Sequence, residues 1–233
     1  MCGRYTQTAP YPKLADRFGL PSKGPKLKPR YNIAPTQDVP VIVKDPNGGP
    51  HLEIMHWGLV PHWAKDPKVG YKMINARAET LKEKPSFRAP LQSRRCIVPA
   101  TGFFEWKREG ARKTPMYFTA ADGEPLGLAG LWETWKTPDG GLLRSFTIIT
   151  TEANGLLKPI HDRMPVILGR EDEAAWMDAG DVSVESLLRM LKPCAEGRLT
   201  GYAVGTLVNS PKNDSEACLS QTKTPSPRGI TSR

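Results

Sequence analysis

The chain has 233 residues, enough for one domain with a substantial core but cramped for two full domains. Its 33 Lys and Arg exceed its 24 Asp and Glu, and the net charge of +9 favours an anionic partner, with an inert basic surface as an equal alternative on charge alone. No stretch reaches the length of a membrane span and polar residues follow the start, so we expect a cytoplasmic protein without anchor or signal peptide.

The first predicted element is a short amphipathic helix from Tyr11 to Leu20, closed by Gly19. Short apolar runs between turn residues then predict strands at Val39–Val43, Leu52–Trp57, Cys96–Val98, Phe103–Trp106, Met116–Thr119, Leu126–Trp132, Leu142–Thr150, Val166–Leu168 and Tyr202–Val208. Helical patterns occur near Glu79–Lys84 and Glu152–Leu157, and at Glu171–Met177 and Val184–Leu191.

These elements predict an α+β fold. We expect a single domain over residues 1–219, with a β-rich, twisted or barrel-like antiparallel core flanked by short helices. Residues 220–233 are rich in Ser, Thr, Pro, Lys and Arg, which predicts a disordered basic tail. Asn47-Gly48-Gly49 lacks the Lys-Ser/Thr of a phosphate loop and is predicted to form a hairpin turn.

The cysteines are far apart and form no C-x-x-C pair; they are Cys2, Cys96, Cys194 and Cys218. In a reducing compartment this spacing indicates neither a disulfide framework nor a zinc site, and we expect no metal and no other cofactor. Three of them are interpreted as ordinary small apolar residues, Cys96 above all because it lies in an apolar run. Cys2 differs because of its position.

Cys2 follows Met1, which aminopeptidases remove when the next residue is small, so the mature chain is expected to start with Cys2 and a free α-amine. An α-amine titrates near about 7.7–8.0 and a thiol near about 8.5, so both nucleophiles are expected to be partly available around neutral pH. They can attack one aldehyde in sequence, the amine forming a Schiff base and the thiolate closing a thiazolidine ring. A buried structural cysteine is the alternative, and position alone favours it.

The segment Ile74–Thr80 follows an aromatic, Gly/Pro-punctuated run that ends at Trp63. Asn75 can donate and accept hydrogen bonds, Arg77 can form a fork on a phosphate, and Trp63 can stack on a base. A helix cap, a surface charge and a core tryptophan are the alternatives, and each is the commoner outcome for one residue alone.

Two further segments carry groups suited to proton transfer. Strand alternation puts Glu105 on the same face as Phe103, and partial burial there is expected to raise its pKa; a cross-strand salt bridge is an equal alternative. His161 titrates where acid or base chemistry is useful, and Arg163 nearby can bind phosphate. A turn stabilised by Asp162, with a structural His161, is the alternative. Together the segments favour an N-terminal nucleophile assisted by Glu105 and His161.

The chain resembles the SOS-response-associated peptidase family over about residues 2–219. The resemblance is carried by six motifs in order: the start Met1–Tyr5, then Arg30–Thr36, Trp57–Pro61, Asn75–Thr80, Gly102–Trp106 and His161–Pro165.

The resemblance implies a sensor of abasic sites in single-stranded DNA that forms a thiazolidine crosslink through Cys2. It further implies that Asn75 positions the amine and the sugar, that Glu105 moves protons, and that His161 assists ring opening and crosslink reversal. Its implied DNA-binding residues are Arg4, Arg77, Arg163 and, less directly, Trp63. The expected partner is single-stranded DNA with abasic sites, bound by a monomer away from membranes.

Two other functions stay open at the level of sequence. The family name suggests a peptidase in which Cys2 attacks an amide, with the chain's own Met1 as the nearest substrate. A non-catalytic single-strand binder would use the aromatic and basic residues, with Cys2 incidental, and would bind intact and abasic strands equally.

Overall fold

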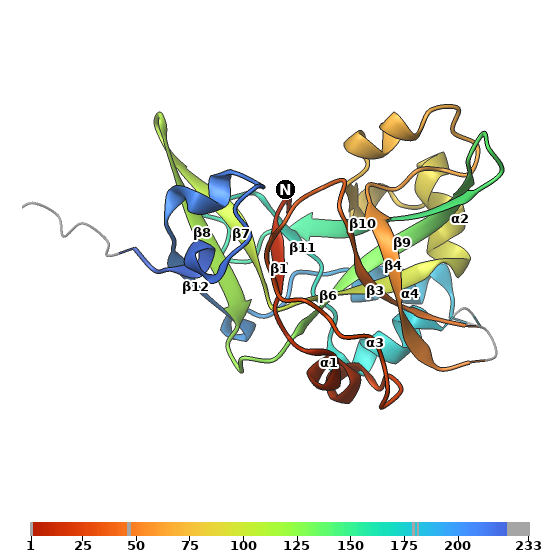
Figure 1. Cartoon of the computed structure of the whole chain (residues 1–233), viewed down its shortest axis with the longest axis horizontal. Coiled ribbons are helices and arrows are strands. Elements are labelled where there is room, and N and C mark those ends of the chain that lie inside the picture. Colours follow the sequence, from red (N-terminus) through yellow and green to blue (C-terminus); the bar gives the residue numbers. More distant parts are fainter. Residues whose placement is uncertain (1, 46–47, 179, 181, 223–233) are drawn as a thin grey trace, which may run out of the picture.

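Most of the chain is built on two β-sheets, as the computed structural model shows (Figure 1). The structure describes residues 2–45, 48–178, 180 and 182–222. In one sheet, the pairings close into a five-stranded barrel in the order β10-β4-β3-β6-β9 and back to β10. Its strands are β3 (Asp38–Lys44), β4 (Pro50–Trp57), β6 (Arg95–Ala100), β9 (Leu126–Lys136) and β10 (Leu142–Glu152).

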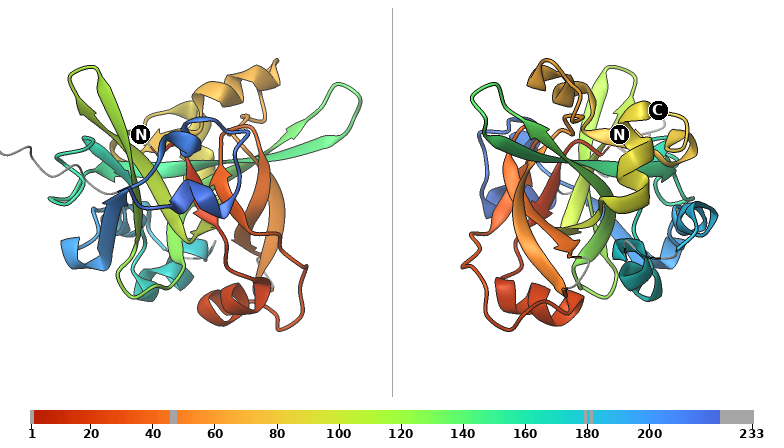
Figure 2. Two further views of the ribbon diagram at one scale, coloured as in Figure 1. Left: turned by 60° about the vertical axis from the view of Figure 1, so that its left-hand side comes forward. Right: turned by 90° about the vertical axis from the view of Figure 1, so that its right-hand side faces the viewer.

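The barrel is antiparallel except where β10 runs parallel to β4. Two short strands pair with the C-terminal part of β10: β5 (Asn75–Arg77) runs parallel to it and β11 (Arg163–Pro165) runs antiparallel. Figure 2 shows the long β9–β10 hairpin, in green, reaching beyond the barrel. Because β10 pairs with both short strands, it brings the Asn75 and His161 segments to one region.

The second sheet is open and antiparallel, in the order β12-β8-β7-β1-β2. Its strands are β1 (Tyr5–Gln7), β2 (Arg30–Ile33), β7 (Gly102–Glu109), β8 (Arg112–Ala120) and β12 (Leu199–Ala203). The chain passes from the barrel strand β6 into β7 with little interruption, so the two sheets share one core. That core cluster contains Cys2 and Phe103 beside barrel residues such as Val41 and Phe146.

Short helices cover the outer face of the barrel. They are α1 (Tyr11–Phe18), α2 (Pro85–Ser93), α3 (Arg170–Met177) and α4 (Val184–Met190), with 3-10 turns at η1 (Pro67–Lys72), η2 (Ala78–Thr80), η3 (Glu196–Arg198), η4 (Thr206–Asn209) and η5 (Glu216–Leu219). Alternate strand residues divide between two clusters: Val41 faces the core that holds Cys2, whereas Ile42 packs with the helices. The β-rich α+β domain predicted from the sequence is therefore confirmed.

Local signals located several elements well. The helix predicted from Tyr11 ends at Phe18, and Gly19 caps it in the left-handed region with φ 65°. β3 and β4 pair as a hairpin from Lys44 opposite Pro50, although Asn47 of the predicted turn lies outside the described residues. Of the predicted tail, Gln221 still bridges to Val204, and residues 223–233 lie outside the described part.

Four element predictions are wrong, and two of them concern helices. Near Glu79–Lys84 only η2 and a turn form, because Lys84 is held extended before Pro85, where α2 begins. No helix forms at Glu152–Leu157, since Glu152 ends β10 opposite Arg163 and the Asn154 side chain then accepts from the Leu157 N–H in a turn, at 3.1 Å.

The other two concern strands. The strand predicted at Val166–Leu168 begins and ends earlier, at β11, because residues 163–165 are the ones that pair with the end of β10. Ile167 makes only an isolated bridge, to Leu128. The strand predicted over Tyr202–Val208 stops at Ala203, since the ladder reaches Pro115, which has no N–H to donate. β1, β2, β5 and α2 were not predicted.

Two glycines cross in close contact where the Trp57–Trp63 segment passes η1. Gly58 has φ 136°, and a Cβ added at Gly70 would lie 2.6 Å from the Gly58 carbonyl oxygen. We therefore expect Gly70→Ala to lower the free energy of unfolding by about 1–3 kcal/mol, as overpacking does, in urea titrations. Gly197→Ala, where the added Cβ meets nothing within 4 Å, is the matched control; equal stabilities of the two variants would contradict this reading.

Candidate active site

Pairing between β1 and β7 brings the start of the chain to Glu105. Tyr5 lies opposite Phe103 in this antiparallel pair, and the Phe104 N–H donates to the Arg4 carbonyl at 3.0 Å. The ladder ends at Tyr5, and the chain just before it lies close enough to Glu105 for the charge of that carboxylate to act on the Cys2 thiol. The negative charge of Glu105 accordingly contributes to the raised pKa of the Cys2 thiol, after burial as the main cause.

The Cys2 thiol is fully buried in the core cluster shared by the two sheets. Burial raises its pKa to about 12, because the thiolate would lose its hydration. The expectation of a partly ionised thiol near neutral pH is therefore wrong in this environment. A Cys2 reaction at neutral pH begins from the thiol, and a neighbouring base must take its proton during bond formation.

Glu105 is a carboxyl group close to Cys2 with properties that suit such a base. Its side chain lies in β7, it is 3% exposed, and burial raises its pKa to about 7. The alternation expected from the sequence is confirmed: Phe103 packs in the cluster that contains Cys2, and Phe104 packs in a separate cluster with Tyr117. A carboxyl group with this pKa can both accept and return a proton near neutral pH.

His161 lies in the turn between β10 and β11. Its Nδ1 accepts a hydrogen bond from the Arg163 N–H at 2.9 Å and also lies 2.9 Å from Oδ1 of Asp162. Burial lowers the pKa of His161, against the opposing charge of Asp162. The Arg163 N–H favours the neutral tautomer with its proton on Nε2, whereas the Asp162 carboxylate favours a proton on Nδ1; the first of these tautomers can donate from Nε2.

A cavity of about 400 Å³ is lined by both Glu105 and His161. Its other lining residues are Trp106, Arg108, Lys113 and Asn209. The Trp106 indole donates to Oδ1 of Asn209 at 2.8 Å, which fixes this wall. None of these four residues was a sequence-predicted site residue, although Trp106 closes the Gly102–Trp106 motif; for Arg108 and Lys113 the only signal was the density of basic residues after that motif.

Asn75 lies in β5 opposite Ile148 of β10. Its Nδ2 donates to the Ile148 carbonyl at 3.4 Å, whereas its Oδ1 is buried and has no hydrogen-bond partner within the described part of the chain. The preceding residue, Ile74, packs against the cluster that contains Cys2. A buried amide oxygen without a partner costs about 1–3 kcal/mol, so a donor on a bound substrate would satisfy it.

Two of the predicted phosphate-binding arginines make internal contacts. Arg4 donates to the Val208 carbonyl at 2.6 Å and to Oδ1 of Asn32 at 2.9 Å. Arg163 forms a bidentate ion pair with Glu79, at 2.7 and 2.9 Å, which holds the pKa of Glu79 below its usual value. Phosphate binding by either arginine stays a prediction, and it requires these contacts to be exchanged.

Arg77 and Trp63 are both exposed and available to a ligand. Arg77 makes no side-chain hydrogen bond or ion pair within the described residues. Trp63 is 54% exposed, next to His62, which contacts the buried carboxylate of Glu133 at 3.2 Å. That carboxylate also accepts from Arg94 at 2.9 Å, so the segment that carries Trp63 is anchored to β9.

Neither a metal centre nor a membrane helix is found in the described residues: no group of three or more His, Cys, Asp and Glu could hold an ion, and no helix is long and apolar enough to cross a membrane.

Comparisons with known proteins agree with the six motifs. The family model described as SOS response associated peptidase (SRAP) matches residues 1–211. Abasic site processing protein YoqW of Bacillus subtilis is 46% identical over 218 residues, which are 92% of this chain and 97% of that protein. Abasic site processing protein HMCES of Xenopus tropicalis is 34% identical, over 83% of this chain and 66% of that protein.

The fold is also shared with solved structures. The crystal structure of a Bacteroides thetaiotaomicron protein superposes with a TM-score of 0.86 at 30% identity, covering 95% of this chain and all of the other. The chain belongs to the SOS response associated peptidase family.

Proposed function

We propose that the chain processes abasic sites by capturing them in single-stranded DNA, as a covalent thiazolidine on Cys2. The names of its relatives from Bacillus subtilis and Xenopus tropicalis support abasic-site processing. The observation that carries the chemistry is that Glu105, whose charge acts on the buried Cys2 thiol, also lines a cavity together with His161. The pKa of Glu105, about 7, suits a proton relay between the two.

The reaction begins once Met1 has been removed and Cys2 carries the free α-amine. An abasic deoxyribose exists mainly as a closed hemiacetal, and its C1′ becomes an aldehyde when the ring opens. The Nε2–H of a neutral His161 is suited to hydrogen-bond to the departing ring oxygen, while Glu105 takes the proton of the C1′ hydroxyl and returns it to that oxygen. Lowering the pKa of His161 by burial keeps the ring in this neutral form at neutral pH.

Capture then takes two bond-forming steps. The amine adds to C1′ and water leaves, giving an imine; the Cys2 sulfur next adds to the same carbon and closes the ring. The thiol proton passes to Glu105 and finally to the imine nitrogen, so the net change is loss of one water. Because the buried thiol is protonated, Glu105 has to act in the second step.

Asn75 is proposed to position the reacting groups. Its buried Oδ1, without a partner in the described part of the structure, can accept from the Cys2 amine or from a sugar hydroxyl. Arg77 and Trp63 are proposed to contact phosphate and base, and Arg4 and Arg163 to join them after exchanging their present partners. We expect a monomer that works in the cytoplasm and needs no cofactor.

A denaturing gel tests the proposed function. Purified protein that has lost Met1 is expected to give a heat-stable, slower band with an abasic single-stranded oligonucleotide and none with the intact strand. Protein that retains Met1 serves as the control and is expected to bind without crosslinking, because it lacks the Cys2 amine. Equal binding of both strands without a covalent product would support a non-catalytic binder instead, whereas loss of Met1 during incubation of purified protein would support self-cleavage.

A further inference from the structure

The β7–β8 hairpin places two cations directly opposite each other. Antiparallel pairing sets Arg108 against Lys113, next to the pair formed by Glu109 and Arg112. Like charges directly opposite in a sheet destabilise the pairing. Figure 1 shows this hairpin, in yellow-green, projecting from the body of the molecule on the side where β1 begins. An anion bound between the two cations would offset their repulsion.

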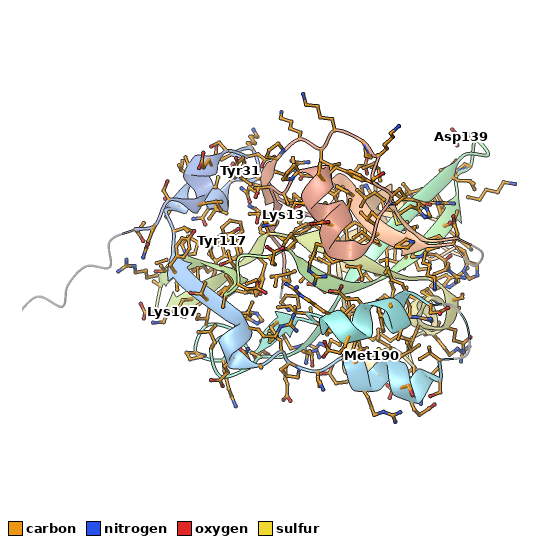
Figure 3. The ribbon with its side chains drawn as sticks, turned by 90° about the horizontal axis from the view of Figure 1, so that it is seen from below. Lys13, Tyr31, Lys107, Tyr117, Asp139 and Met190 are labelled. Carbon is orange, nitrogen blue, oxygen red and sulfur yellow. The ribbon has the colours of Figure 1, made fainter. Side chains whose placement is uncertain are left out.

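Nearby acidic side chains do not supply that anion. Lys107 forms an ion pair with Glu109 at 2.7 Å, and Figure 3 shows Lys107 at the outer edge of the molecule. Arg108 and Lys113 are exposed, and across the described ranges neither makes an ion pair or a side-chain hydrogen bond. The two cations therefore keep their charge available to a ligand.

Both cations line the cavity that contains Glu105 and His161. The pKa of His161 is lowered mainly by burial, and the charge of Arg108 makes a small further contribution, so Arg108 is within electrostatic reach of the ring. Arg4 and Arg163 near this region are occupied by carbonyls and by Glu79. Arg108 and Lys113 thus supply positive charge at the cavity that needs no rearrangement.

An abasic nucleotide has no base to stack or to hydrogen-bond, so the groups left to hold it are its sugar and its flanking phosphates. We propose that Arg108 and Lys113 together bind a phosphate adjacent to the abasic sugar, and so hold C1′ over the cavity. Arg108 can donate two parallel hydrogen bonds to one phosphate, and Lys113 adds a point charge opposite it. This inference rests on the proposed function and adds a DNA contact to it.

The salt dependence of binding measures the phosphate contact. We expect the double variant Arg108→Ala/Lys113→Ala to bind abasic single-stranded DNA more weakly. A plot of the logarithm of its association constant against the logarithm of the salt concentration is expected to be less steep by about 0.7, the value for one lost phosphate contact. Arg112→Ala is the matched control, because it removes a cation from the same hairpin that does not line the cavity. A double variant with the slope of Arg112→Ala would overturn the proposal.

Neutral phosphate analogues locate the contact. In a set of oligonucleotides, one phosphate around the lesion at a time is replaced by a neutral methylphosphonate. At one flanking position, wild type is expected to lose affinity while the double variant loses none. Equal losses for both proteins at every position would refute the phosphate contact of Arg108 and Lys113. Thermal melting checks folding: Lys113→Gln is expected to melt at or above the wild-type temperature, since it relieves the repulsion from Arg108.

Failure of the phosphate contact and failure of the capture reaction give different results. Wild type that shows the Arg108–Lys113 salt effect but forms no covalent product would contradict thiazolidine capture and keep the phosphate contact. Wild type that crosslinks, with unchanged affinity and salt slope in the double variant, would contradict the phosphate contact and keep the capture reaction.

Discussion

Cys2→Ala is expected to abolish the heat-stable product with abasic single-stranded DNA. Alanine leaves the α-amine in place and is small enough for Met1 removal, so an imine still forms, but no sulfur is present to close the ring. The imine is expected to appear on the gel only after borohydride reduction. Binding without reduction is expected to match wild type, because the substitution removes no charge.

Cys96→Ala is the control for this variant. Cys96 is fully buried in the same core cluster as Cys2, and burial raises its thiol pKa as well, so its loss tests whether a missing core thiol alone disturbs the site. We expect the Cys96 variant to crosslink like wild type. A heat-stable product of wild-type yield from Cys2→Ala would exclude Cys2 as the capturing residue.

Glu105→Gln is expected to slow crosslinking by about 10²–10⁴-fold, the usual contribution of a positioned acid or base. In wild type the rate is expected to rise as pH passes about 7, where Glu105 loses its proton and can accept that of the thiol. The variant is expected to lose this step and to keep only the titration of the α-amine. Rapid-quench gels across pH 5–9 measure both. Glu109→Gln, an exposed carboxylate on the same strand, is the control.

The same carboxyl group links stability to pH. Because burial raises the folded-state pKa of Glu105 to about 7, its contribution to stability is fully present below the ordinary pKa of a glutamate and is lost as pH rises through about 7. Relative to Glu105→Gln, wild type is therefore expected to lose up to about 3 kcal/mol of unfolding free energy between acidic and alkaline pH. An unchanged difference across this range would mean that Glu105 titrates normally.

Short-range patterns predicted the parts of the site that depend on one strand. Alternation in Gly102–Trp106 was enough to place Glu105 among apolar residues, and its raised pKa follows from that burial. The protonated state of the Cys2 thiol could not be predicted in this way. It follows from the burial of Cys2, which depends on the pairing of the three-residue strand β1 with β7, far along the chain.

Contacts between distant segments account for the rest. Arg163 and Glu79 are 84 residues apart, so nothing local indicates that they pair and that Arg163 is occupied. The Arg108–Lys113 pair is close in sequence, yet it becomes visible only when the hairpin register is known, since a shift of one residue would oppose different side chains. The barrel itself depends on a parallel pairing between β4 and β10 that no local pattern predicts.

Peptide mapping of the crosslinked product identifies the residue that captures the abasic site. After digestion of the DNA and cleavage by trypsin, we expect the peptide Cys2–Arg4 without Met1, carrying a deoxyribose adduct less one water. Its thiol is expected to resist alkylation because the sulfur is part of the ring. An adduct on a lysine, or on a peptide that keeps Met1 and an alkylatable Cys2 thiol, would contradict thiazolidine capture by Cys2.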